Sequence, residues 1–132
     1  MGFVKYLLDT HTLLWSVRDS AKLSDTALAI IEDTDNTLFV SAVSAYEIMY
    51  KHQLGKMPEY AYLAENYFDV LREFNVDELH INARHAHFAG KFEWSHRDPF
   101  DRLLAAQAFT EDIVLITNDS SFASLPWLST LW

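Results

Sequence analysis

Short apolar runs alternate along the chain with longer segments whose apolar residues recur at helical spacing. Three of these runs end in polar clusters and predict buried parallel strands, at 3–8, 37–41 and 113–117. Weaker strand patterns cover 78–81 and 127–131. The alternation predicts an α/β fold, a three-layer sandwich with a central, mostly parallel sheet of four to five strands.

The segments between these strands carry the signals of helix ends. Ser24 is expected to cap one helix, and a second helix is expected over 43–54, stopping at Gly55. Apolar residues at helical spacing predict a third helix within 59–74, and a shorter one follows Asn82. The last helix begins in the sequence DPFD, whose first aspartate is Asp98, with proline at the first helical position.

Length and composition indicate one globular domain over 1–132. Half of the residues are hydrophobic, which is enough for a buried core. The absence of cysteine excludes disulfides, thiolate metal ligands and a cysteine nucleophile. The sequence has neither a signal-peptide pattern nor an apolar stretch long enough to span a membrane, so we expect a soluble, cytoplasmic protein with no membrane partner.

The net charge of −9 argues at first against a nucleic-acid partner, because phosphate binding usually draws on a surplus of lysine and arginine. That objection weakens if several of the acids share one pocket. Divalent cations held there would reverse the local charge, so the net charge would no longer predict what the pocket attracts.

Four acids are expected at the carboxyl edge of the sheet, where ligands bind in parallel α/β folds. Asp9 ends the first strand and Asp119 follows the strand at 113–117. Asp101 lies at the start of the last helix, and Glu47 lies in the second turn of the helix that follows the strand at 37–41.

Each acid also has a purely structural interpretation. Asp98 suits the N-cap of the last helix, and Asp101 suits its third position, where a carboxylate favours the positive helix end. Glu47 could be a surface acid paired with Lys51 one turn later. The acids that follow the first and last buried strands suit caps or turns. Four separate coincidences would be needed to explain all four in this way.

A pocket of carboxylates without thiolates is typical of a site for Mg²⁺ or Mn²⁺. These cations prefer hard oxygen donors and retain waters for substrate phosphates. Carboxylates held this close do not all stay ionised unless a cation neutralises them. A metal bound there could activate water for the hydrolysis of a phosphodiester.

The motifs that carry these acids resemble those of the PIN-domain ribonucleases of the VapC toxin type. They are LLDTHTLLW at 7–15, SAYEIMYKHQLGK at 44–56, DPFDRLLAAQA at 98–108 and ITNDSSF at 116–122. Together they span nearly the whole chain. One difference is Tyr46, which stands where related sequences often have tryptophan.

The resemblance implies an endoribonuclease toxin that depends on Mg²⁺ or Mn²⁺, hydrolyses RNA, dimerises and is held inactive by a small antitoxin. It assigns catalysis and metal binding to the four acids, with Asp98, Thr117 and Asn118 as supporting residues. The residues concerned in catalysis are Asp9, Glu47, Asp101 and Asp119.

Basic side chains near the expected pocket could contact RNA phosphates. The candidates are Lys51, Arg97 and Arg102, with His52, Lys56 and His96 beside them. His85 and His87 are two positions apart on a predicted helix, so they face different directions and cannot share an ion. His11 lies next to Asp9, but a single histidine near a helix start is more often structural.

Two other classes of protein remain open. An aspartyl-phosphate phosphatase or receiver also carries an aspartate at the end of its first strand, but it favours a second acid two positions later, where this chain has His11. A non-catalytic PIN-like binding module would use the acids only as caps and surface pairs.

Overall fold

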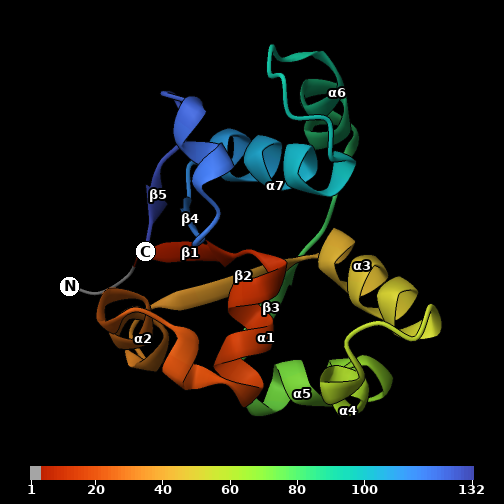
Figure 1. Cartoon of the computed structure of the whole chain (residues 1–132). Helices are drawn as coiled ribbons and strands as arrows, with labels where there is room; N and C mark the ends of the chain where they lie inside the picture. The colour runs from red at the N-terminus through yellow and green to blue at the C-terminus, as the bar shows by residue number, and fades with distance from the viewer. Residues whose placement is uncertain (1–3) are drawn as a thin grey trace.

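The fold is that of a computed structural model, and residues 4–132 are described. Its centre is a parallel sheet of five strands in the order β3-β2-β1-β4-β5 (Figure 1). The strands are β1 Lys5–Leu8, β2 Thr37–Ser41, β3 Val76–Leu79, β4 Val114–Ile116 and β5 Thr130–Leu131. The predicted α/β sandwich with a parallel sheet is therefore confirmed.

Helices connect the strands and cover both faces of the sheet (Figure 1). The α-helices are α1 Thr10–Arg18, α2 Asp25–Glu32, α3 Ala42–Gln53, α4 Ala61–Glu65, α5 Tyr67–Glu73, α6 Ala83–Lys91 and α7 Pro99–Thr110. Three short 3-10 helices are η1 Ser20–Lys22, η2 Pro58–Tyr60 and η3 Ser120–Ser124. Helices α1, α2, α4 and α5 lie on one side of the sheet, and α6 and α7 lie on the other.

Most predicted element ends agree with the structure, because local capping decides them. Ser24 caps α2 by accepting a hydrogen bond from the Ala27 N–H. Helix α3 ends just before Gly55, whose φ of +76° lies in the left-handed region that favours glycine. Phe3, placed in the first strand by the sequence pattern, lies outside the described residues.

Three sequence predictions need correction. The strand predicted at 78–81 lies two residues earlier, and the one expected at 127–131 is confined to its last two residues. The helix expected within 59–74 is broken at Asn66, whose φ of −121° and ψ of 34° depart from helical values. Its side-chain amide donates to the Tyr62 carbonyl at the end of α4.

The core is divided by the sheet into two apolar layers. Leu7 and Leu8 are both fully buried but point to opposite faces, because side chains alternate along a strand. Leu8 packs in the layer that includes Leu13 of α1, and Leu7 packs in the layer that includes Leu104 of α7. Burial on both faces explains why the strands are apolar runs.

The chain leaves β1 towards β2 on one side and reaches β4 on the other side only near its end. The Asp9 N–H donates to the Ile116 carbonyl at 3.2 Å, so the ends of β1 and β4 are joined directly. Crossovers run in opposite directions from this point, and such a reversal leaves a crevice at the carboxyl ends of the strands. Among residues 4–132, no helix is long and apolar enough to cross a membrane.

Candidate active site

A pocket of about 370 Å³ opens at the carboxyl edge of the sheet, between α1, α3 and the start of α7. All four acids predicted from the sequence line it, together with Lys51, Asp98 and Asn118. Its other lining residues are Thr10, His11, Trp15 and Leu104. Acids from four separate elements are therefore brought to one cavity.

Asp9 is the most enclosed of these acids, with 7% of its surface exposed. It caps α1 by accepting a hydrogen bond from the Thr12 N–H at 2.8 Å through Oδ1. Its Oδ2 accepts a second hydrogen bond, of 2.5 Å, from the Thr117 hydroxyl. Burial raises the pKa of Asp9, while the hydrogen bonds from Thr117 and Thr12 oppose that rise. Asp9 thus combines a capping role with a place in the pocket.

Glu47 is also buried, with 8% of its surface exposed, and projects from the second turn of α3. Its Oε1 accepts a hydrogen bond of 2.8 Å from the Thr10 hydroxyl. Its Oε2 forms an ion pair with the Lys51 Nζ at 2.6 Å, one helical turn later. The predicted pairing with Lys51 is therefore real, but it occurs inside the pocket and not on an outer helix face.

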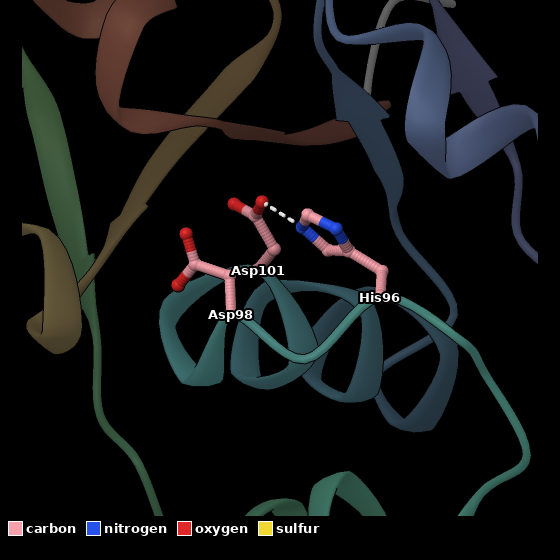
Figure 2. Close-up of side chains that lie close together, drawn as sticks. All are labelled: His96, Asp98 and Asp101. Atoms are coloured by element: carbon pink, nitrogen blue, oxygen red, sulfur yellow. Dashed lines mark hydrogen bonds and ion pairs between the residues drawn. The ribbon is translucent and has the colours of Figure 1, made fainter.

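Asp101 occupies the third position of α7, as predicted, after the Asp98 cap and Pro99. Figure 2 shows its carboxylate beside the His96 ring, and the hydrogen bond between Oδ2 and Nε2 measures 2.7 Å. Burial raises the pKa of Asp101 to about 6, the hydrogen bond from His96 opposes the rise, and the charges of Asp98 and Asp119 add to it.

Asp119 is more exposed than the other three acids and caps the 3-10 helix η3. Burial would raise its pKa, but hydrogen bonds from the Ser121 hydroxyl and backbone N–H outweigh that effect and lower the pKa. The Asp119 N–H donates to the Thr117 hydroxyl oxygen at 3.0 Å. Asp119 can therefore stay ionised, whereas burial opposes the ionisation of Asp9 and Asp101.

The predicted supporting residues take different positions. Asp98 caps α7 through the Phe100 N–H at 2.9 Å and also lines the pocket. Thr117 is buried between two acids, whereas Asn118 is exposed at the pocket wall. Within residues 4–132, one set of three histidine or carboxylate side chains can offer one ligand atom each with all three atoms within 4.8 Å of one another. That set is His96, Asp98 and Asp101.

The predicted RNA-binding residues differ in their surroundings. Lys51 lines the pocket in its ion pair with Glu47, and Arg97 is exposed on the loop before α7. Arg102 points instead into the structure, where its guanidinium donates four hydrogen bonds to backbone carbonyls. We therefore assign Arg102 a structural role and correct the expectation that it contacts RNA.

His85 and His87 do not share a site, as their spacing in the sequence predicted. His85 is buried in the capping box of α6, where its Nδ1 accepts from the Asn82 N–H and its Nε2 hydrogen-bonds Glu111 at 2.8 Å. His87 is exposed and shares no site with it. His11 is exposed at the pocket wall, with its ring 5.8 Å from that of Trp15.

Sequence reasoning missed three hydroxyl groups around the acids, those of Thr10, Thr12 and Ser44. Thr10 donates to Glu47 and lies 2.8 Å from the Ser44 hydroxyl, and all three side chains are buried. The Thr12 hydroxyl donates to the Ile116 carbonyl at 3.0 Å, which ties α1 to the end of β4. The signal in the sequence was a pair of threonines directly after a strand-ending aspartate, where hydroxyls can serve buried partners.

The donor set of this pocket suits a hard divalent cation. Five carboxylates line it, namely Asp9, Glu47, Asp98, Asp101 and Asp119, against the single ammonium of Lys51. Burial opposes ionisation of Asp9 and Asp101, and a cation would relieve that opposition by neutralising both. Oxygen ligands of this kind are what Mg²⁺ and Mn²⁺ take in proteins.

Comparisons with solved structures find the same fold in toxin–antitoxin complexes. DNA-bound VapBC from Salmonella typhimurium matches with a TM-score of 0.71 at 19% identity, over 98% of each chain. VapBC2 from Rickettsia felis, bound to a promoter DNA fragment, matches with a TM-score of 0.67 at 19% identity, over 97% of this chain and 98% of that one. FitAcB from Neisseria gonorrhoeae matches with a TM-score of 0.64 at 19% identity, over 96% of each chain.

None of the curated proteins matches the sequence significantly. The model of the PIN domain, in contrast, matches residues 6–128. That span contains every residue that lines the pocket and all of β2, β3 and β4. Strand β1 begins one residue before it, and β5 lies beyond its end. This chain belongs to the PIN domain family.

Proposed function

We propose that this protein is a metal-dependent endoribonuclease and the toxin of a toxin–antitoxin pair. Membership of the PIN domain family supports a nuclease in general terms. The observation that carries the finer proposal is the pocket itself, in which four acids from separate elements meet at the carboxyl edge of the sheet. Mg²⁺ or Mn²⁺ is the cofactor that this oxygen-rich donor set fits.

Asp9, Glu47, Asp101 and Asp119 are the residues that we propose as metal ligands and catalytic groups. A bound cation would supply an activated water and stabilise the charge that develops on the phosphate oxygens. The protein contributes orientation, because hydroxyl donors fix the two most enclosed acids. Thr117 holds one Asp9 oxygen and Thr10 holds one Glu47 oxygen, so each carboxylate is held in a defined orientation.

Lys51 and Arg97 are the basic residues that we propose for contacts with the RNA backbone. Lys51 lies inside the pocket and Arg97 lies on the exposed loop that precedes α7. Two cations are few for phosphate binding. In this proposal the bound metal supplies the remaining positive charge, which reconciles an RNA substrate with a net charge of −9.

The partners that we propose are a small cognate antitoxin and a second copy of the chain. The structures from Salmonella typhimurium and Rickettsia felis are complexes of VapBC type with DNA, and their fold is shared over nearly the whole length. An antitoxin would hold this toxin inactive in the cytoplasm, where its RNA substrate is found. We propose a homodimer as the assembled form of the toxin.

The deciding experiment is cleavage of total cellular RNA by the purified, antitoxin-free protein with Mg²⁺, Mn²⁺ or EDTA. We expect metal-dependent cutting that falls on the order of a thousandfold in Asp9→Asn and Asp101→Asn, since each loses several kcal/mol of metal-borne stabilisation. The matched control is Asp112→Asn, which changes an exposed aspartate at a left-handed position that asparagine tolerates. Full activity in Asp9→Asn would contradict the proposal.

A second measurement separates the enzyme from the alternatives. Binding of the metal to the folded state should raise the unfolding free energy by about 2.7 kcal/mol at one hundred times the dissociation constant. A non-catalytic binding module predicts no change in the melting temperature with metal. An aspartyl-phosphate enzyme predicts a phosphoryl group trapped on Asp9, whereas metal-activated water leaves the protein unmodified.

A further inference from the structure

The loop between α6 and α7 is held by one arginine. Arg102, one residue after Asp101, donates from Nε to the Ala89 carbonyl at 2.8 Å. Its terminal nitrogens donate to the carbonyls of Phe92 at 2.5 Å, Trp94 at 3.3 Å and His96 at 3.1 Å. A rigid, planar fork of donors therefore fixes the backbone of the loop at alternate residues. The position of the His96 backbone is thereby set relative to α7.

The His96 side chain points from this loop towards the acids at the start of α7. Figure 2 shows its ring directed at Asp101, with Asp98 on the other side of that carboxylate. One possible ligand atom from each of the three residues lies within 4.8 Å of those of the other two. About a third of the His96 side chain is exposed, at 32%, so a small ion could reach it without any rearrangement of the core.

The three residues also differ from a cluster formed only by capping. Capping accounts for Asp98, whose Oδ1 accepts from the Phe100 N–H. Capping does not account for the imidazole of His96, whose backbone is held near these acids by a hydrogen bond from the Arg102 guanidinium. Residues fixed in this way are typical of ligand positions, where supporting contacts orient each donor before the ion arrives.

We infer that His96 is an imidazole ligand of the cation in this pocket, beside Asp98 and Asp101, and that the site prefers Mn²⁺ to Mg²⁺. The inference rests on the metal-dependent function proposed above and adds a nitrogen donor to its four acids. Mg²⁺ demands hard oxygen ligands and sheds its water reluctantly. First-row transition cations accept imidazole, so one nitrogen in the donor set shifts the preference towards them.

A role for His96 that is limited to its hydrogen bond with Asp101 gives a different expectation for metal affinity. If His96 only orients the Asp101 carboxylate, replacing it would weaken the binding of both cations alike, because both need the same oxygen. If His96 binds the cation, replacing it should weaken Mn²⁺ much more than Mg²⁺. His11 lines the pocket of the four acids and forms no ion pair or side-chain hydrogen bond among the described residues, so it offers a control imidazole.

The experiment is pulsed electron paramagnetic resonance of Mn²⁺ bound to the purified full-length protein. Coupling to a directly bound imidazole nitrogen is expected in the unaltered protein and in His11→Asn, and it should disappear in His96→Asn. Absence of nitrogen coupling in the unaltered protein would overturn the inference. So would coupling that survives in His96→Asn, since another residue would then supply the nitrogen.

Calorimetric titration provides the second readout. We expect His96→Asn to lower the affinity for Mn²⁺ by about tenfold or more, with the affinity for Mg²⁺ nearly unchanged. An equal loss for both cations would assign His96 to orienting Asp101 and overturn the inference. Thermal melting of both variants without metal checks that each is folded.

The two proposals fail in different ways. If Mn²⁺ binds and RNA is cut but no nitrogen is coupled, only the role of His96 is lost. If neither Mn²⁺ nor Mg²⁺ binds to the unaltered protein, the metal-dependent function itself is lost and His96 falls with it.

Discussion

Asp9 and Thr117 are joined by a hydrogen bond of 2.5 Å although they lie 108 positions apart in the chain. Thr117 donates its hydroxyl proton to the buried Asp9 carboxylate and accepts the Asp119 N–H on the same oxygen. One small side chain therefore links the acid at the end of β1 to the acid after β4. This link sets the spacing of two proposed metal ligands.

Thr117→Val tests that link, because valine keeps the shape of threonine and removes the hydroxyl. The Asp9 carboxylate loses a donor and the Asp119 N–H loses its acceptor, so the unfolding free energy should fall by about 1 to 3 kcal/mol. The affinity for Mn²⁺ should fall about tenfold. Chemical denaturation and calorimetry measure the two effects. Thr117→Ser, which retains the hydroxyl, should stay close to the unaltered protein, and equal behaviour of both variants would refute the role.

The raised pKa of Asp101 predicts how the stability of the metal-free protein depends on pH. Its pKa is raised from 3.8 to about 6, chiefly by burial, so the folded state binds a proton more tightly than the unfolded state does. The stabilisation is fully present below the unfolded pKa and is lost as the pH rises through the folded one. The loss between about pH 4 and pH 6 is on the order of 2 kcal/mol.

Asp101→Asn should remove this part of the pH dependence and make the metal-free protein more stable at pH 7. Melting temperatures measured from pH 4 to pH 8 in the presence of EDTA test the expectation, with Asp112→Asn as the exposed control. A difference between Asp101→Asn and the unaltered protein that stays constant over that range would show that Asp101 does not titrate in it. Adding Mn²⁺ should reverse the order of stability at pH 7, because the variant lacks a ligand.

Lys51→Met tests whether the ion pair with Glu47 competes with the metal. The Lys51 ammonium contacts a proposed ligand at 2.6 Å and repels any cation in the same pocket. We expect a loss of less than about 1 kcal/mol in metal-free stability, because the lysine is partly exposed. The affinity for Mn²⁺ should rise severalfold, as measured by calorimetry.

The same variant tests the proposed contact between Lys51 and RNA. Binding of uncleaved RNA in EDTA should weaken, and the salt dependence of binding should decrease by about one unit in its logarithmic slope. Lys56→Met serves as the control, since Lys56 is exposed and does not line the pocket. Equal effects of both variants would mean that Lys51 contributes only general charge.

Arg102→Lys tests the structural role of the arginine. An ammonium keeps the positive charge but cannot reach four carbonyls that a planar fork serves at once. The unfolding free energy should fall by about 2 kcal/mol, measured by denaturation. Arg97→Lys, at an exposed position, should change it by less than about 0.5 kcal/mol. Unchanged stability with weaker RNA binding would restore the earlier view of Arg102 as an RNA contact.

The broad fold was predictable because its signals are local. The run at 113–117 is apolar along both faces, and only burial between two layers of helices suits that pattern. The caps Ser24 and Asp98 were also readable, since a capping side chain bonds an N–H two or three residues away. The break at Asn66 was harder to predict, because the helical spacing of apolar residues in 59–74 continues on both sides of it.

The sequence by itself determined which acids lie at the carboxyl edge of the sheet, because strand direction and helix starts place Asp9 and Asp101 there. Only the tertiary structure decided which groups surround them. The Thr117 hydroxyl, the Arg102 clamp and the approach of His96 depend on how distant segments close on one another. Hydrogen bonds of that kind depend on how the segments pack in the folded protein. The two residues that form such a bond have no fixed spacing along the chain, so no sequence pattern predicts it.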